Sequence, residues 1–150
     1  MSIDEISEST PEAMTDEQIR TLLTEEGVGV LGLSTEDAPY MVPMSFGYDG
    51  DATLFFVFLL FGTESRKEIL ADRADRASFL VFDAESAHEW RSVSLTGSIR
   101  AVEDGEWPDV REAMENAWHP DLFSGASPMR GVEGYRFEIE EWTSIAHTSQ

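Results

Sequence analysis

Residues 40–61 read YMVPMSFGYDGDATLFFVFLLF, and this stretch decides the fold class of the 150-residue chain. Its second half, Leu54 to Phe61, is a continuous apolar run, much shorter than the roughly 20 residues that a membrane-spanning helix needs. The run is rich in Phe, Leu and Val, which favours a buried strand. Asp49-Gly50-Asp51 has the composition of a turn, so the sequence predicts two antiparallel strands, at 40–48 and 53–61.

Comparable patterns extend this sheet in both directions along the chain. The spacing of apolar residues predicts further strands at 28–34, 77–82, 90–102 and 134–146, helices at 15–26, 64–73 and 107–118, and a loop at 119–130. The first helix begins with a capping box, Thr15 to Gln18, and the third has Pro108 at a helix-start position. This order predicts a mostly β protein whose antiparallel sheet closes into a small barrel with inserted helices.

The composition excludes several classes of function. The chain contains no Cys, which removes disulfides, thiolate nucleophiles and Cys-based metal sites. Thirty acidic and ten basic residues give a net charge of −20, so we expect neither nucleic acid nor a membrane as a partner. The acids are spread along the chain, a pattern that resembles proteins of salt-loving archaea, in which surface acids keep the protein hydrated.

The N-terminal segment differs from the remainder of the chain. Residues 1–14 are acidic and polar, without the features of a secretory signal or a transit peptide. We expect them to form a disordered leader, followed by one domain at 15–150, and we expect the protein to be cytoplasmic.

One segment concentrates positive charge. Thr63-Glu64-Ser65-Arg66-Lys67 lies where a predicted strand ends and a predicted helix begins. Free backbone N–H groups, two hydroxyls, a guanidinium and the single lysine of the chain meet there, which is typical of an anion site. Spacing alone favours a different interpretation, in which Arg66 and Lys67 pair with Glu64, Glu68 or Asp72 on the surface of the helix.

The order of several short motifs resembles the pyridoxamine 5′-phosphate oxidase-related split β-barrel flavoproteins. The matching segments are Gly29 to Thr35, Pro43 to Phe46, Asp49-Gly50, Ser65-Arg66-Lys67 with Leu70, and Val93 to Gly97. The resemblance covers roughly residues 15–146. It implies a six-stranded antiparallel split β-barrel that forms a homodimer, with FMN bound in clefts at the subunit interface.

The resemblance also implies a set of cofactor-binding residues. The Ser-Arg-Lys segment holds the FMN phosphate in this family, which here implies Ser65, Arg66 and Lys67, preceded by Thr63. Ser92 stands where the vitamin B6 oxidases carry a Gln that reaches FMN, so its contact would be shorter. Trp90 fits dimer packing and the cofactor cleft equally well. The remaining implied contacts come from the strands at 40–48 and 53–61, namely Pro43, Met44, Ser45, Phe46, Leu59 and Leu60.

Two departures from the family pattern bear on the substrate. The vitamin B6 oxidases carry a Ser/Arg-rich loop for the substrate phosphate and an Arg/His-containing C-terminal segment. This chain has His119 to Phe123 and Ile145 to Gln150 at these places, so we expect it not to oxidise pyridoxamine phosphate. The resemblance therefore implies an FMN-dependent oxidoreductase of unknown substrate. A non-catalytic flavin-binding or sensing protein remains the alternative, as do the deazaflavin F420 or haem as cofactors.

No catalytic or metal-binding residue is assigned from the sequence. His88, His119 and His147 lack the spacing of metal ligands on a helix. His119 is the best candidate among them, because it follows Trp118 at the start of a loop that could cover the flavin. We expect Trp118 itself to anchor its helix in the core.

Overall fold

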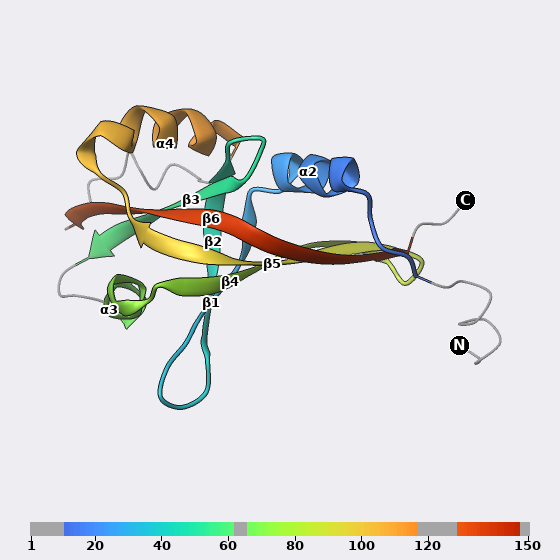
Figure 1. Ribbon diagram of the computed structural model, residues 1–150, viewed down its shortest axis with the longest axis horizontal. Coiled ribbons are helices and arrows are strands. Elements are labelled where there is room, and N and C mark those ends of the chain that lie inside the picture. The colour runs from blue at the N-terminus through green and yellow to red at the C-terminus, as the bar shows by residue number, and fades with distance from the viewer. Residues whose placement is uncertain (1–10, 62–65, 117–128, 148–150) are drawn as a thin grey trace.

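Six antiparallel strands close into a barrel in the computed structural model, which describes residues 11–61, 66–116 and 129–147. The strand order is β1-β2-β3-β6-β5-β4, and pairing of β1 with β4 closes the barrel (Figure 1). The predicted fold class is confirmed. The strands are β1 (Val28–Leu33), β2 (Tyr40–Tyr48), β3 (Thr53–Phe61), β4 (Arg76–Ser86), β5 (Glu89–Ala101) and β6 (Met129–His147).

Within the described ranges, no helix has both the length and the apolar character needed to cross a membrane.

Strand β3 is buried on both faces over residues 53–58, which explains why its sequence is apolar without alternation there. Leu54, Phe56 and Phe58 point into the barrel core. Phe55 lies on the outer face, where it packs with residues of helix α4 (Trp107–Ala113) in a second, smaller cluster. The predicted strand at 53–61 is therefore confirmed, and its amphipathic partner helix lies across its outer face.

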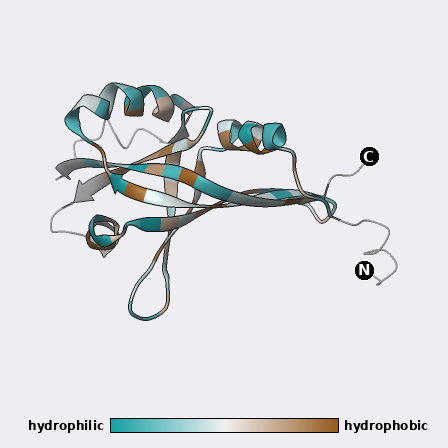
Figure 2. Ribbon diagram, viewed as in Figure 1, coloured by the Kyte–Doolittle hydropathy of each residue, from teal (hydrophilic) through white to brown (hydrophobic). Residues whose placement is uncertain are grey.

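In the part of the chain that the structure describes, three α-helices accompany the barrel. Helix α2 (Asp16–Glu25) begins with the predicted capping box, in which the Thr15 hydroxyl accepts from the Gln18 backbone and the Gln18 side chain accepts from the Thr15 backbone. Its apolar residues face the strands and join the barrel core (Figure 2). Helix α3 (Arg66–Arg73) follows β3. Helix α4 is flanked by single 3-10 turns, Asp104–Glu106 and Met114–Asn116, so the helical segment begins earlier than the predicted residue 107.

Two strand boundaries differ from the predictions by more than one residue. Strand β4 continues to Ser86 instead of ending at residue 82, because its last residues pair with β5 while staying exposed, and hydropathy carries no signal for such pairing. Strand β6 begins at Met129, inside the predicted loop, because Met129 pairs with Phe61 at the end of β3. The remaining residues of that loop up to 128, with Trp118 and His119, lie outside the described residues.

A bulge between β5 and β6 changes which residues of β6 face the core. The register shifts between Thr96 and Gly97, which pair with Glu141 and Ile139 respectively. The strands approach so closely here that a Cβ on Gly97 would lie 1.9 Å from the Glu138 carbonyl oxygen. Tyr135, Phe137 and Ile139 alternate towards the core, and a continued alternation would place Glu141 there. Because of the shift, Glu141 is exposed, and Trp142 packs against the core instead.

The chain is already ordered before the predicted start of the domain. Glu12 exchanges two backbone hydrogen bonds with Ala146, at 2.9 and 2.8 Å. Met14 is buried, and its backbone N–H donates to the Ser144 hydroxyl at 2.8 Å. The segment expected to be a disordered leader is thus attached to β6 over residues 11–14, and residues 1–10 lie outside the described part.

Candidate functional site

The basic segment lies at the junction of β3 and α3. Strand β3 ends at Phe61, and helix α3 begins at Arg66, so the backbone of Arg66 and Lys67 forms the first turn of a helix. Thr63 and Ser65 lie outside the described residues, as do the side chains of Arg66 and Lys67. The predicted arrangement of a strand end followed by a helix start is therefore present, and a helix start carries unpaired N–H groups that attract anions.

Helix α3 is attached to the barrel by buried apolar side chains and by one hydrogen bond. Ala71 is buried, and Leu70 packs against the barrel core. The hydroxyl of Tyr135, a fully buried residue of β6, donates to the Asp72 carboxylate. Burial, reinforced by the carboxylate of Asp72, raises the pKa of Tyr135, so the phenol stays protonated and remains a donor. The tyrosine ring packs against Phe58, with ring centroids 4.8 Å apart.

Sequence reasoning missed this contact. The alternation of β6 places Tyr135 in the core, but no local signal pairs it with a carboxylate 63 positions away. A tyrosine at a core position is itself the available hint, because a buried phenol usually finds a hydrogen-bond partner.

The four candidate residues on β2 face two different ways. Met44 and Phe46 point inward and are 5% and 1% exposed. Pro43 is exposed and Ser45 is half-buried, because they alternate with these core residues on the strand. A ligand outside the barrel could thus touch Pro43 and Ser45 through their side chains.

Met44 and Phe46 could reach such a ligand only through their backbone. On β3, Leu59 and Leu60 pair with Val132 and Gly131, and their side chains lie outside the described part.

A mostly uncharged surface, the uncharged outer face, runs across five neighbouring strands, with the exposed Glu141 next to it on β6. One row is formed by successive register partners, Pro43, Val30, Leu80, Ser94 and Thr143. The most exposed large apolar residues of the described chain lie on the same strands: Val28 (40%), Met41 (65%), Phe82 (52%) and Ile145 (45%). Apolar and hydroxyl side chains without charge are unexpected here, because the chain as a whole carries a net charge of −20.

Trp90 and Ser92 lie towards the far end of the β4–β5 hairpin. Ser92 pairs with Phe82 on one side and Ile145 on the other, which places it on the uncharged outer face. Trp90 stacks on His147, with ring centroids 6.2 Å apart. The Nδ1–H of His147 donates to the His88 carbonyl oxygen at 2.6 Å. The structure therefore brings two of the three histidines together, although the described residues contain no group of three candidate metal ligands.

The candidate residues are too far apart for one chain to form one site. Trp90 pairs with Ala84, which lies eight positions along β4 from Arg76, close to the end of α3. At about 3.3 Å per residue this separation is about 26 Å. Figure 1 shows α3 and the β4–β5 hairpin tip at opposite ends of the long axis. A single small ligand could not contact both within one chain.

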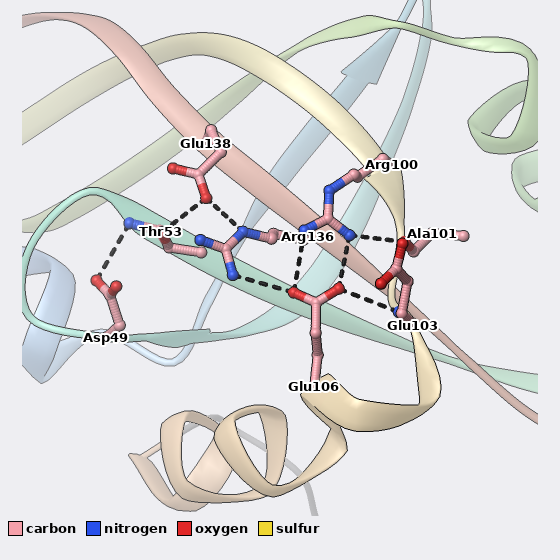
Figure 3. Close-up of polar contacts among 8 residues, drawn as sticks. All are labelled: Asp49, Thr53, Arg100, Ala101, Glu103, Glu106, Arg136 and Glu138. Carbon is pink, nitrogen blue, oxygen red and sulfur yellow. Dashed lines mark hydrogen bonds and ion pairs between the residues drawn. The ribbon is translucent and has the colours of Figure 1, made fainter.

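An ion-pair network, which includes none of the candidate residues, lies beside α4 (Figure 3). Glu106 accepts hydrogen bonds from Arg100 at 2.6 and 3.0 Å and from Arg136 at 3.0 Å. Arg136 also donates to Glu138, which accepts from Thr53 of β3 at 3.1 Å. The hydrogen bonds from Arg100, the strongest influence, lower the pKa of Glu106 to about 2. The network ties the start of α4 to β5, β6 and β3, which is a structural role.

The comparisons with known proteins agree with this architecture. The family model described as pyridoxamine 5′-phosphate oxidase matches residues 15–146. None of the curated proteins compared with the chain matches it.

Three solved structures illustrate the similarity of fold. A FAD-binding protein from Mesorhizobium loti has a TM-score of 0.75 at 20% identity, covering 93% of this chain and 98% of that one. The FAD binding protein from Mycobacterium smegmatis has a TM-score of 0.70 at 14% identity, covering 93% and 100%. The FAD and heme binding protein from the same organism has a TM-score of 0.66 at 15% identity, covering 93% and 74%.

The family match spans nearly all of the barrel and includes both groups of candidate residues, the α3 junction and the outer face. On this basis the chain belongs to the pyridoxamine 5′-phosphate oxidase family.

Proposed function

We propose that the protein binds a flavin nucleotide, with the phosphate of its FMN moiety at the start of α3, and acts as a flavin-dependent oxidoreductase. The observation that carries the proposal is the β3–α3 junction, where Arg66 and Lys67 open a helix that is anchored to the barrel through Tyr135 and Asp72. An anchored helix start binds an anion without first having to become ordered, which lowers the cost of binding. The solved relatives named as FAD-binding proteins support a flavin as the ligand class.

The binding site would be completed by a second copy of the chain. About 26 Å of strand β4 lie between Arg76, close to the end of α3, and Ala84, the partner of Trp90, so residues of both groups can contact one flavin only if two chains supply them. A partner that binds the uncharged outer face should itself be uncharged where the two surfaces meet. The same face of a second copy of the chain meets this requirement. Exposed Met41, Phe82 and Ile145 would then be buried in a homodimer.

The reaction is proposed at the level of class. The described part of the chain offers no cluster of acid, base and nucleophile at the outer face, and a bound flavin would itself supply the electron-transfer chemistry. The role of Pro43, Ser45 and Ser92 would be to contact the flavin ring from an uncharged surface. We propose a substrate other than pyridoxamine phosphate, because the family's substrate-anchoring segments have no counterpart in the sequence.

The phosphate site is tested by replacing its two cations together. We expect Arg66→Ala with Lys67→Ala to weaken FMN binding about a hundredfold or more, since each charge-assisted hydrogen bond contributes roughly 1.5–3 kcal/mol and each 1.4 kcal/mol is tenfold. Quenching of flavin fluorescence measures the affinity. Arg111→Ala, an exposed cation on α4, is the control and should leave it unchanged. Equal affinity of the double variant and the wild type would refute the phosphate site.

The remaining parts of the proposal have separate measurements. Mass spectrometry of the ligand released on denaturation distinguishes a flavin from F420 or haem. Consumption of NADH, NADPH or reduced F420 with a panel of acceptors tests for turnover, and its absence would favour the non-catalytic alternative. Sedimentation tests the homodimer: Phe82→Glu introduces a charge at the outer face and should shift a dimer towards monomer, whereas a monomeric wild type would contradict the proposal.

A further inference from the structure

The last residue of strand β6, His147, contacts the β4–β5 hairpin in two ways. Its ring stacks on Trp90 of β5, with ring centroids 6.2 Å apart and an angle of 22° between the ring planes. Its Nδ1–H donates to the carbonyl oxygen of His88, in the turn between β4 and β5, at 2.6 Å. A ring held both by a hydrogen bond and by a stacking contact has one defined orientation, because rotation would break at least one of the two.

The two stacked rings lie at the edge of the uncharged outer face. Trp90 pairs with Ala84 on β4 and with His147 on β6. Alternate side chains of a strand share a face, so Trp90 points to the same side of β5 as Ser92. Trp90 is only half-buried in the single chain. Part of its ring is therefore available to a ligand, while His147 stacks on it.

The N-terminal segment holds the residue that precedes His147. Ala146 exchanges two backbone hydrogen bonds with Glu12, at 2.8 and 2.9 Å, on the edge of β6 that faces away from β5. Two residues further along the chain, the Met14 backbone N–H donates to the Ser144 hydroxyl at 2.8 Å, and the Met14 side chain is buried. The end of β6 is thus fixed on one edge by β5 and on the other by residues 12–14.

These contacts lie outside the part of the sheet that closes the barrel. Strand β1 pairs with β4 at residues 78–80, and β3 pairs with β6 between residues 129 and 138. Ala84, Trp90 and His147 lie beyond both pairings, towards the tip of the β4–β5 hairpin. The contacts of His147 therefore act on the orientation of the hairpin tip and not on barrel closure.

We infer that His147 is a positioning residue of the cofactor site. It holds Trp90 in the orientation in which this ring contacts the flavin bound at α3 of the second chain, and residues 12–14 hold His147 in place. This inference rests on the proposed function and deepens it, because it names what orients the contribution of the second chain to the site. A tryptophan that is ordered before the ligand arrives does not have to be ordered on binding, which removes part of the cost of binding.

Titration of the full chain with FMN in a double-mutant cycle tests the inference. We expect Trp90→Ala to weaken binding about tenfold or more, as the loss of a stacked ring does. His147→Ala should weaken it about two- to tenfold, the effect of one side chain left to be ordered on binding. In the Trp90→Ala background, His147→Ala should have no further effect. Equal losses in the two backgrounds, or no loss in the wild-type background, would overturn the inference.

A pair of variants at Glu12 tests the role of the N-terminal segment. Glu12→Pro removes the N–H that donates to Ala146 and should weaken FMN binding by a factor similar to that of His147→Ala. Glu12→Ala is the matched control, because it keeps this N–H and changes only an exposed side chain, and it should retain the wild-type affinity. Equal affinities of the two Glu12 variants would overturn the role of residues 12–14.

A measurement without flavin separates this inference from the proposal beneath it. NMR relaxation of the Trp90 indole N–H in the flavin-free protein reports the mobility of the side chain. We expect the indole to be ordered in the wild type and more mobile in His147→Ala and Glu12→Pro. Equal mobility in the wild type and in His147→Ala would overturn the inference even if FMN binds. Absence of FMN binding by the wild type would instead refute the proposed function, and with it the flavin contact of Trp90.

Discussion

Replacing Glu106 with Gln tests whether the ion-pair network holds α4 on the barrel. Glu106 is the shared acceptor for Arg100, Arg136 and the Glu103 backbone N–H, which lies 3.1 Å away (Figure 3). A Gln side chain keeps one acceptor oxygen and turns an NH₂ group towards the guanidinium groups, so the two-point contact with Arg100 is lost. Glu106→Gln should therefore destabilise the attachment of α4.

The size of this effect follows from the pKa of Glu106. Its shift from 4.5 to about 2 corresponds to an upper limit of about 3 kcal/mol, since each pKa unit is worth about 1.4 kcal/mol. The Glu106 side chain is 17% exposed, but that of Arg100 is 51% exposed, so solvent screens part of the interaction. We expect the variant to lose about 1–2 kcal/mol of unfolding free energy at pH 7.

The pH dependence provides a second test with a defined sign. The folded-state pKa lies below the unfolded value, so the stabilisation is fully present above about pH 4.5 and is lost as the pH falls towards about 2. The difference in unfolding free energy between wild type and Glu106→Gln should thus be constant from pH 7 to about 5.5 and shrink below pH 4.5. Urea denaturation followed by tryptophan fluorescence measures both proteins across this range.

A matched control keeps the interpretation specific. Glu112→Gln removes an exposed carboxylate of α4 that forms no ion pair with the described residues, and it should change the stability by less than about 0.5 kcal/mol. The reasoning fails if Glu106→Gln is as stable as the wild type at pH 7. It also fails if the difference at pH 3 equals the difference at pH 7, because the carboxylate would then not be the stabilising group.

Two further substitutions test the anchoring of α3 and the β5–β6 bulge. Tyr135→Phe removes the hydrogen bond to the Asp72 carboxylate and should cost about 1.5–3 kcal/mol while increasing amide exchange in α3; unchanged exchange would mean that the phenol does not hold the helix. Gly97→Ala places a methyl group 1.9 Å from the Glu138 carbonyl oxygen and should cost more than about 2 kcal/mol by thermal or urea unfolding. Gly105→Ala, where a Cβ meets no atom within 4 Å, serves as its comparison, and equal losses in both variants would contradict the close approach at the bulge.

Most element positions followed from the sequence because their signals are local. The capping box at Thr15 and the alternation of β5 each depend on residues a few positions apart, and the first helix and both central strands lie where predicted. Predictions failed where pairing with a distant strand decided the outcome. The last residues of β4 are exposed, so only their partners on β5 reveal them as a strand, and β6 begins at Met129 because of Phe61.

Some features of the candidate site likewise have a local signal in the sequence, and others do not. The basic segment at 63–67 and its place between a strand and a helix are visible in the sequence, because charge and helix starts are local features. Met44 and Phe46 point into the core, as alternation along the strand predicts. The family motif alone does not indicate this direction, because it lists residue types and not the face of the strand on which each lies. Neither the contact of Tyr135 with Asp72 nor that of His147 with His88 has a local signal, since each joins residues about 60 positions apart.

By itself, the sequence determined a cysteine-free, strongly acidic barrel of six antiparallel strands with one basic helix start. Local backbone preferences and the period of apolar residues suffice for that much. The tertiary structure alone decided the separation of Trp90 from the end of α3, about 26 Å along β4, and the uncharged outer face. These features arise from strand register and barrel closure. Both depend on contacts between residues that are distant in the chain, and such contacts leave no periodic pattern in the sequence.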